Sequence, residues 1–139
     1  MELSDITTPA LAYLGDSVLE VCVRTYLVTE RGLSTSAHLN RASLDFVRAS
    51  AQSEAFGRME PHLTEEEISV FKRGRNMGHG NVPKSASVAE YRRATGMEVL
   101  FGYLHLTGQT QRMDFLFRVG YGLIVPDVPN TLQAGETPT

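Results

Sequence analysis

The sequence has few of the residues and segments on which several classes of protein depend. Its 139 residues include one cysteine, Cys22, which excludes an internal disulfide framework and a zinc site built from several cysteines. No apolar run approaches the roughly 20 residues that a transmembrane helix needs. The N-terminal segment carries acids and no basic cluster, so we expect no signal peptide. These absences predict a cytoplasmic protein without a membrane partner.

The motifs of several common active sites are also missing. The four histidines are scattered, and no His-Glu-x-x-His motif occurs, which argues against a zinc site built on histidine. The glycine-rich stretch at 74–80 lacks the spacing of a dinucleotide-binding or phosphate-binding loop. Cys22 lies on an apolar helical stripe, where burial makes a thiol a poor nucleophile.

The apolar residues recur at helical spacing along most of the chain, so we expect an all-α fold. With 42% hydrophobic and 21% charged residues, the composition is typical of a globular domain, and the length suits a single one. We expect one domain over residues 1–125 and a disordered proline-containing tail over 126–139. The apolar pattern and the cap residues predict helices near 9–30, 34–47, 51–59, 64–73, 87–108 and 109–123.

Charge is distributed unevenly along the chain. The net charge is −3, but the segment 72–93 holds six basic residues and one acid, which gives it +5 and leaves −8 for the rest. A concentrated basic segment on an acidic body can hold a polyanion locally. A solvated loop would have the same composition, and charge alone leaves both interpretations open.

Two carboxylates, Asp16 and Glu98, stand in the middle of predicted helices among apolar neighbours. Such acids are costly to bury unless something pairs with them. A divalent cation shared between the two helices would be one such partner, and an arginine would be another. Glu20 follows one turn after Asp16, and we expect it to pair with Arg24. Glycines at three positions would let the two helices approach closely: Gly15, Gly96 and Gly102.

Three segments, in this order, resemble a known family. The stretch Leu11-Ala-Tyr-Leu-Gly-Asp16-Ser-Val-Leu-Glu20 resembles the signature helix of the ribonuclease III catalytic domain. Tyr91-Arg-Arg-Ala-Thr-Gly-Met-Glu98-Val-Leu-Phe-Gly-Tyr-Leu resembles that domain's second acidic helix. Between them, Lys72-Arg-Gly-Arg-Asn76 and Val82-Pro-Lys84 are similar to the short subfamily called Mini-ribonuclease III. The resemblance extends from about Leu11 to Gly122.

The resemblance implies a fold, an activity and a site. The family domain is all-helical and forms a homodimer, whose two sites line one valley that accepts double-stranded RNA. Each site hydrolyses one strand with Mg²⁺ and leaves a 5′-phosphate and a short 3′ overhang. Asp16 and Glu98 match the central catalytic, metal-binding carboxylates. The implied natural substrate is precursor large-subunit (23S) ribosomal RNA, and ribosomal proteins are further partners that the resemblance leaves open.

The metal-binding set is smaller here than in larger members of the family. Where those members carry a Glu four residues before the Asp, this chain has Ala12. Where they carry an Asp three residues before the Glu, it has Thr95. Mini-ribonuclease III members share this reduced set, and Mg²⁺ commonly needs only one or two carboxylates when substrate phosphate supplies further oxygens.

The basic segment is the expected RNA contact, because we expect no double-stranded RNA-binding domain after residue 125. A-form RNA is recognised mainly through phosphates and 2′-hydroxyls, which suits flexible basic and amide side chains. The alternative is structural: Arg73 or Arg75 would instead pair with Glu20 or Asp45. The residues expected to bind RNA are Lys72, Arg73, Arg75, Asn76 and Lys84.

Three functions remain to be separated. The first is a dimeric, magnesium-dependent endoribonuclease for structured RNA. The second is a non-catalytic RNA-binding protein that keeps the fold, and loss of divalent-dependent cleavage in Asp16→Asn would separate it from the first. The third is a helical protein-interaction module with both acids in salt bridges, which would show neither RNA affinity nor an effect of magnesium on thermal stability.

Overall fold

The described part of the chain is all-helical, as the sequence predicts. A computed structural model describes residues 3–77, 84 and 86–126, and among these residues there is no strand. The expected disordered tail, apart from Pro126, and the motif residues Val82 and Pro83 lie outside the described residues. None of the described helices is long and apolar enough to cross a membrane. The elements are η1 (Leu3–Asp5), α1 (Thr8–Thr29), α2 (Ser36–Val47), α3 (Ala49–Met59), η2 (Glu60–His62), α4 (Glu65–Arg75), α5 (Val88–Leu106) and α6 (Thr110–Gly120).

Local signals in the sequence set the helix ends. Thr7 caps α1 through its hydroxyl, which accepts a hydrogen bond from the Ala10 amide at 3.2 Å, and Pro9 lies in the first turn. Thr64 and Ser87 each begin a complete capping box, at α4 and α5 respectively. After α1 the chain turns at Gly32, whose φ of 64° is a conformation that favours glycine.

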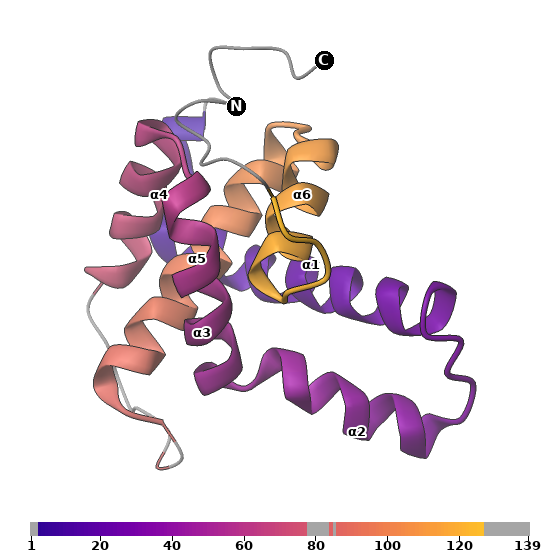
Figure 1. The fold of residues 1–139 in the computed structure, drawn as a ribbon. Helices are drawn as coiled ribbons and strands as arrows, with labels where there is room; N and C mark the ends of the chain where they lie inside the picture. The colour runs from indigo at the N-terminus through magenta and orange to yellow at the C-terminus, as the bar shows by residue number, and fades with distance from the viewer. Residues whose placement is uncertain (1–2, 78–83, 85, 127–139) are drawn as a thin grey trace.

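Helix α5 runs through the middle of the domain, with the other long helices around it (Figure 1). Every residue from Ala94 to Leu104 is buried except Glu98, which is half-buried. A helix that is apolar on nearly all sides is stable only when neighbours cover it on all sides. The one carboxylate in this stretch therefore interrupts an otherwise complete core.

Helices α1 and α5 meet backbone to backbone. A Cβ atom on Gly15 would lie 1.6 Å from the Glu98 carbonyl oxygen, and one on Gly102 would lie 2.4 Å from the Leu11 carbonyl oxygen. The predicted role of these two glycines is confirmed. The prediction for Gly96 is wrong, because it packs against the Phe71 ring of α4, where an added Cβ would lie 2.5 Å from a ring carbon.

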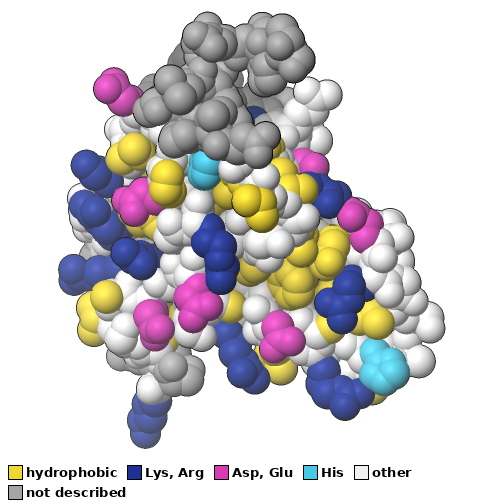
Figure 2. All heavy atoms as spheres, viewed as in Figure 1, with side chains coloured by type: hydrophobic (Ala, Val, Ile, Leu, Met, Phe, Trp, Pro, Cys, Tyr) yellow, Lys and Arg dark blue, Asp and Glu magenta, His cyan; other side chains and the backbone are white. Residues whose placement is uncertain are grey.

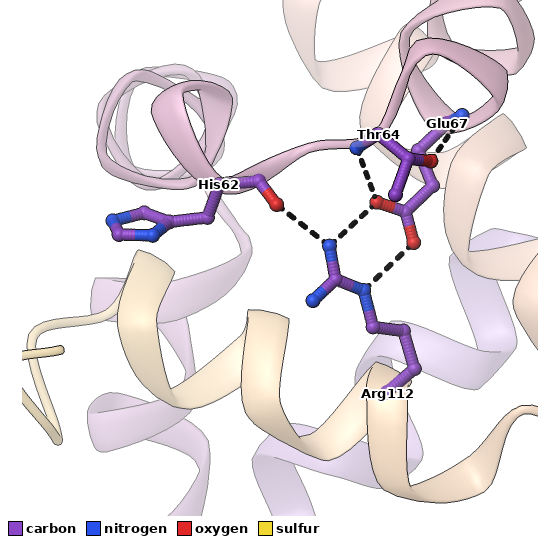
Figure 3. A network of polar contacts seen from close by, with 4 residues as sticks. All are labelled: His62, Thr64, Glu67 and Arg112. Atoms are coloured by element: carbon purple, nitrogen blue, oxygen red, sulfur yellow. Dashed lines mark hydrogen bonds and ion pairs between the residues drawn. The ribbon is translucent and has the colours of Figure 1, made fainter. Parts of the chain in front are cut away.

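A buried polar cluster joins the start of α4 to the first turn of α6 (Figure 3). Arg112 donates from Nε to Glu67 Oε2 at 2.8 Å and from Nη2 to Glu67 Oε1 at 2.7 Å. Arg112 Nη2 also donates to the His62 carbonyl at 2.6 Å, and the Thr64 amide donates to Glu67 Oε1 at 2.9 Å. Burial alone would raise the pKa of Glu67, but the hydrogen bonds from Arg112 and Thr64 hold it below the ordinary value.

We expect Arg112→Met to destabilise the protein by about 3 kcal/mol at neutral pH, because it leaves the Glu67 carboxylate buried without its partner. Since the pKa of Glu67 is lower in the folded state, the wild-type contribution is full above the ordinary value of 4.5. It is lost as the pH falls through the folded-state pKa, so the difference between variant and wild type should shrink in acid. Urea unfolding at neutral and acidic pH measures both effects.

Arg24→Met is the matched control, because Arg24 pairs with Glu20 at 3.2 Å on the exposed surface of α1. It should cost no more than about 0.5 kcal/mol. Equal losses of stability in the two variants would show that the buried Arg112–Glu67 pair stabilises the fold no more than the exposed Arg24–Glu20 pair.

Candidate active site

The crossing of α1 and α5 brings Asp16 to Glu98. Asp16 directly follows Gly15 on α1 and is exposed, whereas Glu98 is half-buried on α5. The contact between the Gly15 backbone and the Glu98 carbonyl leaves no room for a side chain between the two helices at this point. The two acids that the sequence singles out are therefore neighbours, although 82 residues separate them in the sequence.

The two carboxyl groups interact directly. Burial, together with the negative charge of Asp16 and hydrogen bonding to its carboxyl, raises the pKa of Glu98 to about 8. Two carboxyl groups so close cannot both ionise cheaply without a cation. The pair of carboxyl groups therefore needs a positive charge close by to be fully ionised.

No basic side chain in the described part of the chain forms an ion pair with Asp16 or Glu98. The sequence allows either a divalent cation or an arginine as the partner of these two acids. No arginine among the described residues pairs with them. The expected pair between Glu20 and Arg24 is confirmed.

The alternative pairing of Arg73 or Arg75 with Glu20 or Asp45 is wrong for the described contacts. Arg73 instead donates to the Ile6 carbonyl at 3.2 Å and to Thr8 Oγ1 at 3.3 Å. It therefore ties the end of α4 to the start of α1. Arg75 donates to Asn76 Oδ1 at 3.1 Å, and its guanidinium lies 6.0 Å from the centre of the Phe71 ring.

The position of Thr95 adds no third ligand. Its side chain is buried, and its hydroxyl donates to the Tyr91 carbonyl at 3.0 Å within α5. Among residues 3–77, 84 and 86–126, no group of three or more His, Cys, Asp or Glu side chains could hold a metal ion. A divalent cation would thus have two protein carboxylates here and would take its other oxygens from water or substrate. This donor set fits Mg²⁺, which usually keeps several waters.

The basic segment lies at the far end of α4. Lys72, Asn76 and Lys84 are exposed, and Arg75 is half-buried. Figure 2 shows Lys and Arg side chains gathered along the edge of the molecule that α4 forms in Figure 1. The residues between Met77 and Lys84, His79 among them, lie outside the part that the structure describes. Of the five predicted RNA contacts, Arg73 bonds to the distant start of α1, whereas Arg75 and Asn76 bond to each other at the end of α4.

Cys22 is unsuited to nucleophilic chemistry, as the sequence indicates. It is half-buried on α1, and burial together with the charge of Asp114 raises the pKa of its thiol to about 11. Almost none of it is thiolate at neutral pH.

Comparison with known proteins finds one family over most of the chain. The family model described as "Ribonuclease III domain" matches residues 9–109. Among similar proteins, the Mini-ribonuclease 3 of Clostridium tetani is 37% identical over 118 residues, which cover 85% of this chain and 78% of that protein. The Mini-ribonuclease 3 of Symbiobacterium thermophilum is 49% identical over 104 residues, 74% of this chain and 78% of that protein.

A solved structure shares the fold. The crystal structure of a protein from Fusobacterium nucleatum superposes with a TM-score of 0.74 at 27% sequence identity. The match covers 83% of this chain and 91% of that one. The same helical arrangement thus extends over most of both chains.

Proposed function

This chain belongs to the ribonuclease III family and is an endoribonuclease; from that premise we propose that it cuts double-stranded or structured RNA with Mg²⁺ held by Asp16 and Glu98. The observation that carries the proposal is the pair of interacting carboxyl groups at the α1–α5 crossing, without a cationic side chain among the described residues. A bound dication would offset both the burial and the charge of Asp16, which together raise the pKa of Glu98.

In this proposal the residues of the chain supply the negative charge that binds the cation and fix the position of the site. Asp16 and Glu98 act as deprotonated ligands, and the backbone contact at Gly15 fixes the separation of their helices. Mg²⁺, when bound, supplies a more acidic water and neutralises charge that develops on the phosphate. The carboxylates are thus both the metal-binding and the catalytic residues.

We propose that Lys72, Arg75, Asn76 and Lys84 contact the RNA backbone. Lys72, Asn76 and Lys84 are exposed and Arg75 is half-buried, and their position at and beyond the end of α4 supports this role. Arg73 remains in the proposed RNA-binding set, but its bonds to Ile6 and Thr8 give it a second role. By holding α4 to the start of α1, it links the basic segment to the helix that carries Asp16.

We propose that the catalytic domain spans residues 1–125 and acts as a cytoplasmic homodimer on precursor large-subunit ribosomal RNA. Two sites related by a two-fold axis suit a duplex, whose strands are themselves related by a pseudo-dyad. Helix α1 presents large apolar side chains to solvent, with Tyr13 85% and Val21 63% exposed, as an unpartnered face would. Sedimentation should give twice the chain mass of 15.3 kDa, and a monomer at micromolar concentration would contradict the dimer.

Incubation with a structured duplex RNA, with Mg²⁺ or with EDTA, tests the proposed activity. We expect short products only with Mg²⁺. Binding without cleavage in either condition would favour the non-catalytic RNA-binding protein. Neither binding nor cleavage would favour a helical interaction module.

A further inference from the structure

An open basic pocket lies where α1 passes into α2, away from the Asp16–Glu98 pair. It has a volume of about 420 Å³ and is formed by the α1–α2 connection and one face of α2. Figure 2 shows Lys and Arg side chains beside a histidine over this end of the molecule, where Figure 1 places the α1–α2 connection. The lining residues are Arg31, Leu33, His38, Arg41, Ala42 and Asp45.

The arginine and histidine side chains of this pocket face solvent and have spare donors. Arg31, His38 and Arg41 are exposed, and no described contact places any of them in an ion pair. Arg41 bonds through Nε to the Ala37 carbonyl at 3.4 Å, which leaves its terminal nitrogens for a ligand. Asp45 is the one acid in the lining, and it too is outside the ion pairs of the described residues.

The pocket and the proposed active site lie at different points along helix α1. Asp16 and the end of α1 at Thr29 are 13 residues apart on one continuous helix, which corresponds to about 20 Å along its axis. A ligand that reaches both places must be long and must carry negative charge along its length. An RNA backbone has both properties, and guanidinium groups bind phosphate through several parallel hydrogen bonds.

We infer that this pocket is a second RNA phosphate site, which holds the part of a long duplex that extends beyond the Asp16–Glu98 pair. The inference rests on the proposed function, because it takes the bound polymer to be RNA. It gives Arg31 and Arg41 a positioning role, with no part in the chemical step. The pocket therefore makes the enzyme prefer duplexes that extend past the cleavage point.

The test compares a duplex of about one helical turn with one of about three turns, in EDTA so that neither is cut. For the Arg31→Ala/Arg41→Ala double variant, affinity for the long duplex should fall about tenfold at low salt. The slope of log affinity against log salt should become shallower by about 1.4 to 1.8, which corresponds to two lost phosphate contacts. Affinity for the short duplex should stay within twofold of wild type.

Asp45→Asn provides a variant with the opposite sign, since it removes the only negative charge in the pocket lining. It should bind the long duplex several-fold more tightly, whereas Glu54→Gln makes the same charge change at an exposed position on α3 and should have little effect. Arg31→Lys/Arg41→Lys should recover most of the affinity, and all variants should melt within a few degrees of wild type.

The outcomes distinguish failure of the second phosphate site from failure of the proposed nuclease function. Wild-type binding in the double variant, or an equal loss for both duplexes, would overturn the distal site while leaving the nuclease intact. Failure of the wild-type protein to bind or cut any duplex would instead overturn the proposed function itself.

Discussion

Asp16→Asn and Glu98→Gln are each expected to reduce cleavage of duplex RNA by about a thousandfold or more, since a metal ion supplies several kcal/mol of transition-state stabilisation. Each variant removes one of two carboxylates in a site where the described residues offer no third ligand. RNA binding in EDTA should remain close to wild type, because the phosphate contacts lie on other residues. Single-turnover cleavage and equilibrium binding on the same preparations measure the two effects separately.

The stability of Glu98→Gln in EDTA provides an independent check of the same pair. The folded-state pKa of Glu98 is raised from 4.5 to about 8, so the folded wild type holds a proton that the unfolded chain releases. Wild-type stability should therefore fall as the pH rises from about 4.5 to about 8, and Glu98→Gln should escape this loss. We expect the variant to melt several degrees above wild type at pH 8 without metal, and to gain nothing from added Mg²⁺.

Glu54→Gln, an exposed change on α3, should leave cleavage and the pH dependence of melting unaltered. Normal turnover in Glu98→Gln would move the metal site elsewhere. A wild-type protein and a Glu98→Gln variant with the same pH profile would show that the fold, through burial and the charge of Asp16, does not raise the pKa of Glu98.

Gly15→Ala is expected to cost more than about 3 kcal/mol and to abolish cleavage. The added Cβ would lie 1.6 Å from the Glu98 carbonyl oxygen, and backbone atoms cannot rotate away as a side chain can. Helices α1 and α5 would have to separate, which would open the core and move Asp16 from Glu98 at once. Thermal and urea unfolding measure the loss of stability, and cleavage at a temperature where the variant remains folded measures the displaced site.

Gly57→Ala is the matched control for that substitution. Gly57 is exposed within α3, and an added Cβ would meet nothing within 4 Å. Alanine is a better helix former than glycine by about 1 kcal/mol, so this variant should be at least as stable as wild type. Similar melting of Gly15→Ala and wild type would contradict the close crossing of α1 and α5.

Features that depend on near neighbours in the chain could be predicted from the sequence. The helix starts at Thr64 and Ser87 follow from capping boxes that span four residues. Asp16 and Glu98 stood out because each has apolar neighbours in the sequence, although the structure leaves Asp16 exposed. Such signals depend on residues close together in the sequence, so they can be recognised without knowledge of how the helices pack.

Features that depend on how helices pack could not be predicted in the same way. Glu67 was recognisable only as part of a helix start, because nothing in the sequence links it to Arg112, 45 residues later. Arg73 bonds to Ile6, 67 residues earlier, where charge alone suggested a carboxylate partner. Gly96 was assigned to the wrong helix contact, because the spacing of glycines does not say which neighbour each one faces.

The central claim is that Asp16 and Glu98 together hold a divalent cation. Anomalous scattering from a crystal of the wild-type protein grown with Mn²⁺ in place of Mg²⁺ tests it most directly. The account predicts one peak between the two side chains, within about 2.3 Å of an oxygen from each, and its loss in Asp16→Asn crystals. A protein that cleaves RNA with Mn²⁺ but shows its peak elsewhere, with none at this pair, would contradict it.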